Sequence, residues 1–263
     1  NANYFDRIIR LSINLTNSLL KGKAKKMTEM RPSSMNILQN SRQHVLSQIQ
    51  QACEISGRDV ESVELLAVSK THPSEVLRDM YACGQRAFGE NYLQEALQKI
   101  EALQDLEIEW HFIGHVQRNK TKHLAEQFAW VHGVDRLIIA ERLSAQRLIT
   151  QPPLNLCLQV NIDGQDSKDG CQPDEVAELV KSISQLPHIK LRGLMVIPAP
   201  NNTQAFKAAK VLFDQVKELH VHPEDWDTLS MGMSGDMVDA IAAGSTMVRV
   251  GTALFGARDY SQH

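Results

Sequence analysis

Hydrophobic and polar positions follow two periods along this chain from Met35 onward. Short apolar runs, typical of buried strands, are separated by stretches in which apolar residues recur at helical spacing. The runs predict eight strands, at 64–70, 86–90, 109–114, 130–134, 154–162, 190–197, 228–233 and 247–255. The intervening stretches predict helices that include 35–56, 73–83, 91–103, 202–220 and 237–243.

This order of elements predicts an α/β fold. Strands that alternate with helices imply right-handed crossovers between parallel strands, and at 263 residues the natural solution is a single closed (βα)8 TIM-type barrel. The alternative is an open doubly wound sheet. Against it, no predicted strand leads into a GxGxxG or GxxxxGK[ST] phosphate loop.

Charge divides the chain into two parts. Residues 1–34 hold seven Lys or Arg against two acids, so the formal net charge of −3 splits into +5 there and −8 in the rest. We expect 1–34 to be a leader, added by cloning or translated from upstream sequence, and 35–263 to form the barrel. The barrel has no basic field for nucleic acid or an anionic membrane, and no apolar run reaches the ~18 residues of a membrane span.

Cysteine usage indicates the compartment. Cys53, Cys83, Cys157 and Cys171 are scattered, with no CxxC pairing. This pattern fits a reducing environment, so we expect a cytoplasmic protein. We also expect a monomer.

Lys70 is the residue most indicative of chemistry. It closes the predicted strand 64–70, where Leu66, Val68 and Lys70 share one face. A lysine desolvated at the end of such a row has a lowered pKa, and its amine becomes a nucleophile that condenses with carbonyls to Schiff bases. The alternative is a strand-end lysine whose amine reaches solvent.

The carboxyl ends of the last two predicted strands suggest a phosphate site. Arg249 and Gly251 share a face of an apolar strand, and an unpaired buried guanidinium costs several kcal/mol, so Arg249 should have a partner. Gly251 allows close approach to the backbone, while Ser234 and Thr252 offer hydroxyls where barrels often hold phosphate. Together with Lys70 these residues predict a phosphorylated carbonyl ligand. For Arg249, an internal salt bridge is the alternative.

A metal site is not expected. His111 and His115 have i, i+4 spacing, but they lack a predicted helix and a third ligand.

Several motifs, in order along the chain, resemble those of the pyridoxal phosphate homeostasis proteins, the YggS/PROSC family. The similarity runs from about residue 36 to 260. It is carried by Ala67-Val68-Ser69-Lys70, Phe88-Gly89-Glu90-Asn91-Tyr92, Trp110-His111-Phe112-Ile113-Gly114, Gln117-Arg118-Asn119-Lys120, Arg192-Gly193-Leu194-Met195, Met231-Gly232-Met233-Ser234, and the run from Gly244 to Gly256. The family resembles the barrel domain of alanine racemase, and we expect this chain to lack that enzyme's second, β-rich domain, since it ends eleven residues after Thr252.

The resemblance implies pyridoxal 5′-phosphate (PLP) as cofactor and a set of binding residues. These are Lys70 as the Schiff-base lysine, Arg249 at the pyridine nitrogen, Ser234, Gly251 and Thr252 around the phosphate, and Asn91 and Met195 along the ring. Lys168 matches a loop lysine near the cofactor, or is a solvated loop lysine. Gly235 departs from the family, in which many members carry an acid there.

The resemblance favours a carrier over an enzyme. Arg249 only donates hydrogen bonds, so the pyridine nitrogen stays unprotonated and the ring is a weak electron sink. We therefore expect no catalytic residues and no enzyme activity, but reversible storage of PLP on Lys70 and buffering or delivery to apo PLP-dependent enzymes. The alternatives are a PLP-dependent amino-acid racemase of low activity and, without the resemblance, a Schiff-base aldolase acting on a sugar phosphate.

Overall fold

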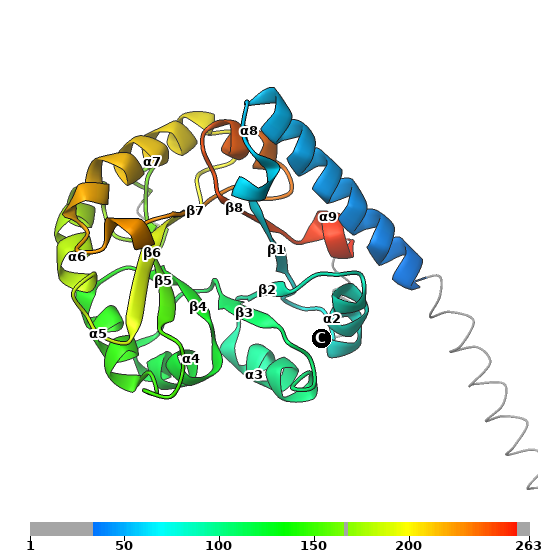
Figure 1. Ribbon diagram of the computed structural model, residues 1–263, viewed down its shortest axis with the longest axis horizontal. Coiled ribbons are helices and arrows are strands. Elements are labelled where there is room, and N and C mark those ends of the chain that lie inside the picture. Colours follow the sequence, from blue (N-terminus) through cyan, green and yellow to red (C-terminus); the bar gives the residue numbers. More distant parts are fainter. Residues whose placement is uncertain (1–33, 166–167, 257–263) are drawn as a thin grey trace, which may run out of the picture.

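Eight parallel strands close into a barrel in the computed structural model, which describes residues 34–165 and 168–256 (Figure 1). Each strand pairs with its neighbours in chain order, and β8 pairs with β1 to close the ring. The strands are β1 (Glu64–Val68), β2 (Ala87–Glu90), β3 (Glu109–Phe112), β4 (Trp130–Val134), β5 (Leu154–Val160), β6 (Ile189–Val196), β7 (Thr228–Ser230) and β8 (Met247–Val250). The structure confirms the predicted (βα)8 barrel.

Helices surround the barrel, because each strand must return to the same edge of the sheet before the next parallel strand begins. They are α2 (Ser74–Ala82), α3 (Leu93–Ala102), α4 (Thr121–Gln127), α5 (Leu137–Gln146), α6 (Val176–Ile183), α7 (Thr203–Val216), α8 (Met237–Ala242) and α9 (Thr252–Phe255). Short 3-10 turns lie at Val60–Ser62, Arg118–Lys120, Pro173–Glu175, Lys217–Leu219 and Pro223–Asp225.

A helix at 34–55 fills the outer ring between α8 and α2 (Figure 1). Its Arg42 donates hydrogen bonds to the side chain of Gln85 and the carbonyl of Gly84, just after α2. Arg58, which follows the helix, donates to the carbonyls of Ile241 and Ser245 at the end of α8. The predicted leader 1–34 lies outside the described residues except for Ser34, which is the first described residue of this helix.

Alternate residues of each strand face opposite sides of the sheet, so one set packs against the helices and the other points into the barrel interior. Leu65 and Ala67 of β1 face the helices and belong to the main hydrophobic core, whereas Leu66 and Val68 face the barrel interior. Two small apolar clusters fill part of that interior. One comes from β1, β2, β8 and the end of β3, and the other contains Trp130, Cys157 and Met195 of β4, β5 and β6.

Six predicted strands end one to five residues earlier than expected, and β1, β7 and β8 are the three that bear on candidate site residues. β1 ends at Val68, so Lys70 lies in the turn after the strand, and β7 ends at Ser230 rather than at 233. β8 ends at Val250, and residues 252–255, predicted as strand, form the short helix α9. The residues that follow these three strands include Lys70, Met233 and Thr252, which line a pocket.

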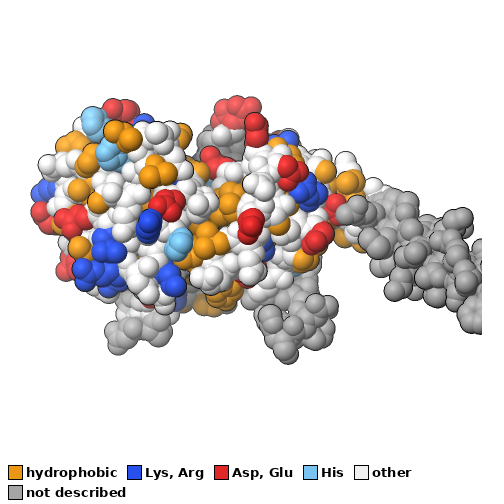
Figure 2. All heavy atoms as spheres, turned by 90° about the horizontal axis from the view of Figure 1, so that it is seen from below, with side chains coloured by type: hydrophobic (Ala, Val, Ile, Leu, Met, Phe, Trp, Pro, Cys, Tyr) orange, Lys and Arg blue, Asp and Glu red, His pale blue; other side chains and the backbone are white. Residues whose placement is uncertain are grey.

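The face of the molecule seen in Figure 2 carries charges of both signs. On the side of the molecule in Figure 2, acidic and basic side chains are both spread over the surface, with apolar side chains between them. Among the described residues, no helix has the length and apolar character needed to span a membrane.

Candidate functional site

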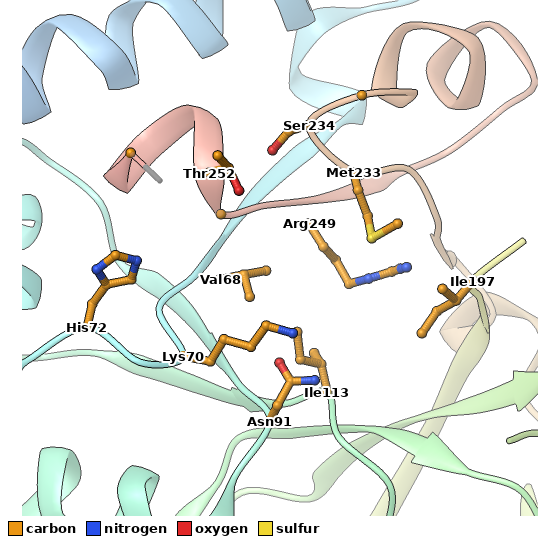
Figure 3. A pocket seen from close by; sticks show the side chains of 13 residues that line it. Val68, Lys70, His72, Asn91, Ile113, Ile197, Met233, Ser234, Arg249 and Thr252 are labelled. Atoms are coloured by element: carbon orange, nitrogen blue, oxygen red, sulfur yellow. The ribbon is translucent and has the colours of Figure 1, made fainter. Parts of the chain in front are cut away.

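A pocket of about 340 Å³ opens at the carboxyl ends of the strands (Figure 3). Its walls come from the segments that follow β1, β2, β3, β6, β7 and β8. The lining residues are Val68, Lys70, His72, Asn91, Ile113, Ile197, Met233, Ser234, Gly235, Arg249, Gly251, Thr252 and Gly256. This is the edge at which barrel enzymes place their sites.

Six of the seven residues expected to hold a cofactor line this pocket: Lys70, Asn91, Ser234, Arg249, Gly251 and Thr252. Met195 does not. It is fully buried against Trp130 and Cys157, level with Ser230 in the register of β6 and β7. Ile197, two residues further along the chain, takes the place at the pocket, because successive inward positions of a strand climb by one layer.

The turn that carries Lys70 has a constrained backbone. The His72 amide donates to the Ser69 carbonyl at 3.1 Å, which closes the turn around Lys70 and Thr71. Thr71 has a φ of 68°, in the left-handed region that non-glycine residues seldom occupy. Its amide donates to the Glu95 carboxylate at 2.6 Å. The half-buried Lys70 side chain extends beside Asn91 and Ile113 in Figure 3.

A buried ion cluster supports this turn from below. Lys99 of α3 is 4% exposed and donates to the Ser69 carbonyl at 2.8 Å, to Glu90 at 2.7 Å and to Glu95 at 2.5 Å. The Ser69 hydroxyl donates to the same Glu90 oxygen at 2.6 Å. Burial raises the pKa of Glu90, and the Lys99 ammonium opposes this shift. The residues on both sides of Lys70 are therefore tied to β2 and α3.

Arg249 lies beneath the pocket and is 4% exposed. Its guanidinium donates to the Ser230 hydroxyl at 2.9 Å and to the Val196 carbonyl at 3.0 Å. The sequence analysis predicted a partner for this guanidinium, and both hydrogen-bond partners are neutral groups. Within residues 34–165 and 168–256, Arg249 forms no ion pair. Burial lowers its pKa to about 10, partly offset by Asp236, so the group is still a cation at neutral pH. It has three further N–H groups for a ligand.

The opposite wall carries hydroxyl groups. Ser234 and Thr252 lie close together above Arg249 in Figure 3. Ser234 is on the loop after β7, and Thr252 is the first residue of α9. The Ser234 loop is held at its ends, since the Met233 amide donates to Asp236 at 2.6 Å. At Gly251, a Cβ atom would approach the Val68 carbonyl oxygen to 3.2 Å, so glycine lets β8 and β1 meet closely here. Neutral donors of this kind suit a phosphate group.

Asn91 provides a polar group without a partner. Among the described residues, its side-chain oxygen is buried and accepts no hydrogen bond. The backbone there is tightly packed, because a Cβ at Gly114 would lie 2.2 Å from the Asn91 carbonyl oxygen. A buried, unsatisfied oxygen at the wall of a pocket fits a site that a ligand with a donor completes.

The remaining candidates lie elsewhere. Lys168 donates to the Ile197 carbonyl at 2.9 Å and pairs with Asp163 at 3.3 Å, so it links two loops and is not among the lining residues. His111 and His115 do not converge. His111 is buried in the barrel and bonded to Glu109, whereas the half-exposed His115 pairs with Asp169 at 3.1 Å. Gly235 lines the pocket and has open space where a Cβ would be.

Sequence reasoning missed several lining residues. Val68, Ile113 and Ile197 lie two positions from inward-facing Leu66, His111 and Met195, so the period of the strands was a signal that could have found them. His72, stacked on Phe255 at 4.8 Å, and Met233 lie in turns. Those two positions lie outside the strands, so strand periodicity could not have indicated them.

The fold is that of a known class of cofactor-binding barrel. Residues 41–259 match the family model described as alanine racemase, N-terminal domain. Alanine racemase from Corynebacterium glutamicum has the same fold, with a TM-score of 0.62 at 14% identity over 87% of this chain and 63% of that chain.

Relatives of higher identity narrow the family. A pyridoxal phosphate homeostasis protein of Pseudomonas aeruginosa is 54% identical over 217 residues, 82% of this chain and 94% of the relative. The pyridoxal phosphate homeostasis protein of Escherichia coli K12 is 48% identical over 236 residues, which are 87% of this chain and 100% of that relative. PipY of Synechococcus elongatus, solved with PLP bound, has a TM-score of 0.67 at 36% identity over 80% of this chain and all of its own. The chain belongs to the pyridoxal phosphate homeostasis protein family, which confirms the resemblance seen in its motifs.

Proposed function

We propose that this protein binds PLP in the pocket, holds it reversibly as a Schiff base on Lys70, and buffers it or delivers it to apo PLP-dependent enzymes without catalysing a reaction. The observation that carries the proposal is the convergence of Lys70, Arg249 and the Ser234 and Thr252 hydroxyls on one pocket. PipY, a relative at 36% identity, has been solved with PLP bound.

The chemistry of the lining residues fits PLP. When bound, PLP would supply an aldehyde. The Lys70 amine would condense with it, forming a C=N bond with loss of one water. Ser234, Thr252 and the backbone at Gly251 would hold the phosphate. Arg249 would donate to the pyridine nitrogen, and Asn91 would lie along the ring.

The arrangement disfavours turnover. Arg249 is a cation that only donates, so it holds the ring nitrogen unprotonated and leaves little electron-withdrawing capacity. Racemisation also needs proton transfer on two faces of a substrate. Besides Arg249, the ionisable groups among the described lining residues are Lys70 and His72, which come from one turn. They therefore approach a ligand from one side.

The pocket is open enough for exchange of its ligand. Met233, Gly235, Thr252 and Gly256, all at its wall, are exposed. A Schiff base at an accessible site can hydrolyse and release its aldehyde, as a carrier requires. We propose that the protein acts in the cytoplasm as a monomer, in line with its four free cysteines.

Borohydride reduction tests the assignment of Lys70. After incubation with PLP and reduction, peptide mass mapping should find the cofactor on Lys70, and the yellow colour of the Schiff base should disappear. Lys70→Ala should show neither the Schiff-base absorption before reduction nor the cofactor mass at this position afterwards. Lys168→Ala serves as the matched control, because it removes another lysine near the pocket and should label like wild type. Label on Lys168 in place of Lys70 would refute the proposal.

A further inference from the structure

A chain of hydrogen bonds crosses the barrel interior from its base to the pocket. Glu109 contacts His111 at 2.9 Å, and His111 Nδ1 lies 3.0 Å from His132 Nε2. His132 Nδ1 lies 3.2 Å from the Ser230 hydroxyl, which accepts from Arg249 at 2.9 Å. Glu109 is half-exposed, and the other four side chains of this hydrogen-bond chain are each at least 96% buried. The proposed function uses only Arg249.

The two ends restrict where the protons lie. At one end the Arg249 guanidinium can only donate. At the other, the hydrogen bond from His111 holds the pKa of Glu109 below its usual value, so Glu109 is a carboxylate and accepts from His111 Nε2. Between them, burial lowers the pKa of His132 well below that of free histidine, with His111 and Arg249 acting in the same direction. His132 is therefore neutral.

One arrangement, with a proton on Nε2 alone of each imidazole, satisfies every contact. His111 carries its proton on Nε2, so its Nδ1 accepts from His132 Nε2–H. His132 Nδ1 then accepts from the Ser230 hydroxyl, and the Ser230 oxygen turns a lone pair towards Arg249. Each dipole points its positive end to the carboxylate and its negative end to the guanidinium. Hydrogen bonds aligned in this way strengthen one another.

We propose that Ser230, His132 and His111 are positioning residues that fix the Arg249 guanidinium and couple it to Glu109 as a remote counter-charge. This deepens the proposed function, on which it rests for the role of Arg249 at the ring nitrogen. The hydrogen-bond chain explains how a buried cation is stabilised although both of its hydrogen-bond partners are neutral. It also leaves the remaining N–H groups of Arg249 for the ligand.

The surroundings of the two imidazoles hold this arrangement. Trp130 stacks on His111 with a centroid distance of 5.2 Å and an angle of 7°, which fixes the plane of the ring. At the base of the barrel, a carboxylate oxygen of Glu64 lies within 4.8 Å of a carboxylate oxygen of Glu109 and of a ring nitrogen of His111. The Arg192 guanidinium lies 4.9 Å from the centre of the Trp130 ring and offsets that negative charge.

Nuclear magnetic resonance of the protein without cofactor tests the proton arrangement directly. In ¹⁵N-histidine-labelled protein at neutral pH, His111 and His132 should both show a protonated Nε2 and an unprotonated Nδ1. His111→Gln and His132→Gln assign the signals. A protonated Nδ1 on His132, or a cationic imidazole at either position, would overturn the proposal.

Binding measurements test the link to the pocket. Ser230→Ala should weaken PLP binding about tenfold, but should leave the affinity for 1-deazapyridoxal 5′-phosphate, in which C–H replaces the ring nitrogen, unchanged. Ser230→Thr keeps the hydroxyl and should restore wild-type affinity. Ser245→Ala is the matched control. The Ser245 hydroxyl is also buried, but it donates to backbone carbonyls and is not part of the hydrogen-bond chain from Glu109 to Arg249.

Equal losses for both ligands, or the same selective loss in Ser245→Ala, would contradict the positioning role. A wild-type protein that binds PLP no better than the deaza analogue would contradict the proposed role of Arg249 instead. The resonance experiment then decides on the hydrogen-bond chain, because it needs no ligand.

Discussion

At the scale of single residues, Arg249 shows how a buried charge indicates a ligand. A buried guanidinium usually faces a carboxylate, because an uncompensated charge costs several kcal/mol. Arg249 instead donates to the Ser230 hydroxyl and the Val196 carbonyl, and keeps three N–H groups beneath an open pocket. This arrangement suits a neutral acceptor such as a pyridine nitrogen better than a second charged group.

The hydroxyl groups of Ser234 and Thr252 support the first prediction. Replacing either residue by Ala removes one hydrogen bond to a charged acceptor, worth about 1.5 to 3 kcal/mol, so the Kd for PLP should rise about ten- to a hundredfold. Pyridoxal, which has no phosphate, should bind all variants alike. Fluorescence titration measures both. Ser62→Ala removes a hydroxyl before β1, at the other end of the barrel, and should change neither Kd. Unchanged PLP affinity in both variants would place the phosphate elsewhere.

The four thiols support a second prediction, on pH. Burial raises the pKa of Cys157 and of Cys171 to about 12 each, so at pH 8 about one thiol in ten thousand is the reactive thiolate. Iodoacetamide followed by mass spectrometry should label the half-exposed Cys83 first. Labelling of Cys157 and Cys171 should stay slow from pH 7 to 9 in the native protein and become fast in urea. Early labelling of Cys157 would contradict its burial.

At the scale of elements, the turn after β1 depends on β2 and α3. Lys99 on α3 joins the Ser69 carbonyl to Glu90 of β2, and Glu95 binds the Thr71 amide. The position of Lys70 is thus set by residues 20 to 30 positions away in the chain. The Thr71 backbone is unfavourable locally, and this cluster compensates for it.

Removing the ammonium of this cluster should destabilise the protein. Lys99→Met leaves Glu90 buried without its counter-ion, and we expect the free energy of unfolding to fall by about 3 to 5 kcal/mol in urea denaturation. Adding Glu90→Leu should recover a large part of that loss, because the buried charge is then removed. Lys122→Met is the control, since the Lys122 side chain is mostly exposed and its pair with Glu126, at 3.8 Å, should contribute less than about 1 kcal/mol. If the double variant were no more stable than Lys99→Met, charge burial would not be the cause.

At the scale of the whole molecule, the barrel acts as a rigid ring with its chemistry at one edge. The helix at 34–55 completes the outer layer that the short α9 cannot fill, and the pocket stays accessible at the carboxyl ends of the strands. The proposed carrier role requires a ligand that is held at this edge and can still leave it. This combination favours a carrier.

The carrier role predicts transfer without turnover. PLP-loaded protein should restore activity to an apo PLP-dependent enzyme, and Lys70→Ala treated in the same way should restore much less. Incubation with L-alanine in deuterium oxide should give α-proton exchange at about the rate of free PLP, measured by proton resonance. Stereospecific turnover that Lys70→Ala abolishes would establish the racemase alternative.

The order and type of the strands, the closed barrel and six residues at one pocket could all be predicted from the amino-acid pattern. Parallel strands buried on both faces must be apolar runs, and ligands gather where such strands end, so both features are local in the chain. Only the tertiary structure decided that Met195 lies one layer below the pocket, that Lys70 follows its strand, and that Arg249 pairs with Ser230. These features depend on the register between strands and on partners distant in the chain, which no local pattern encodes.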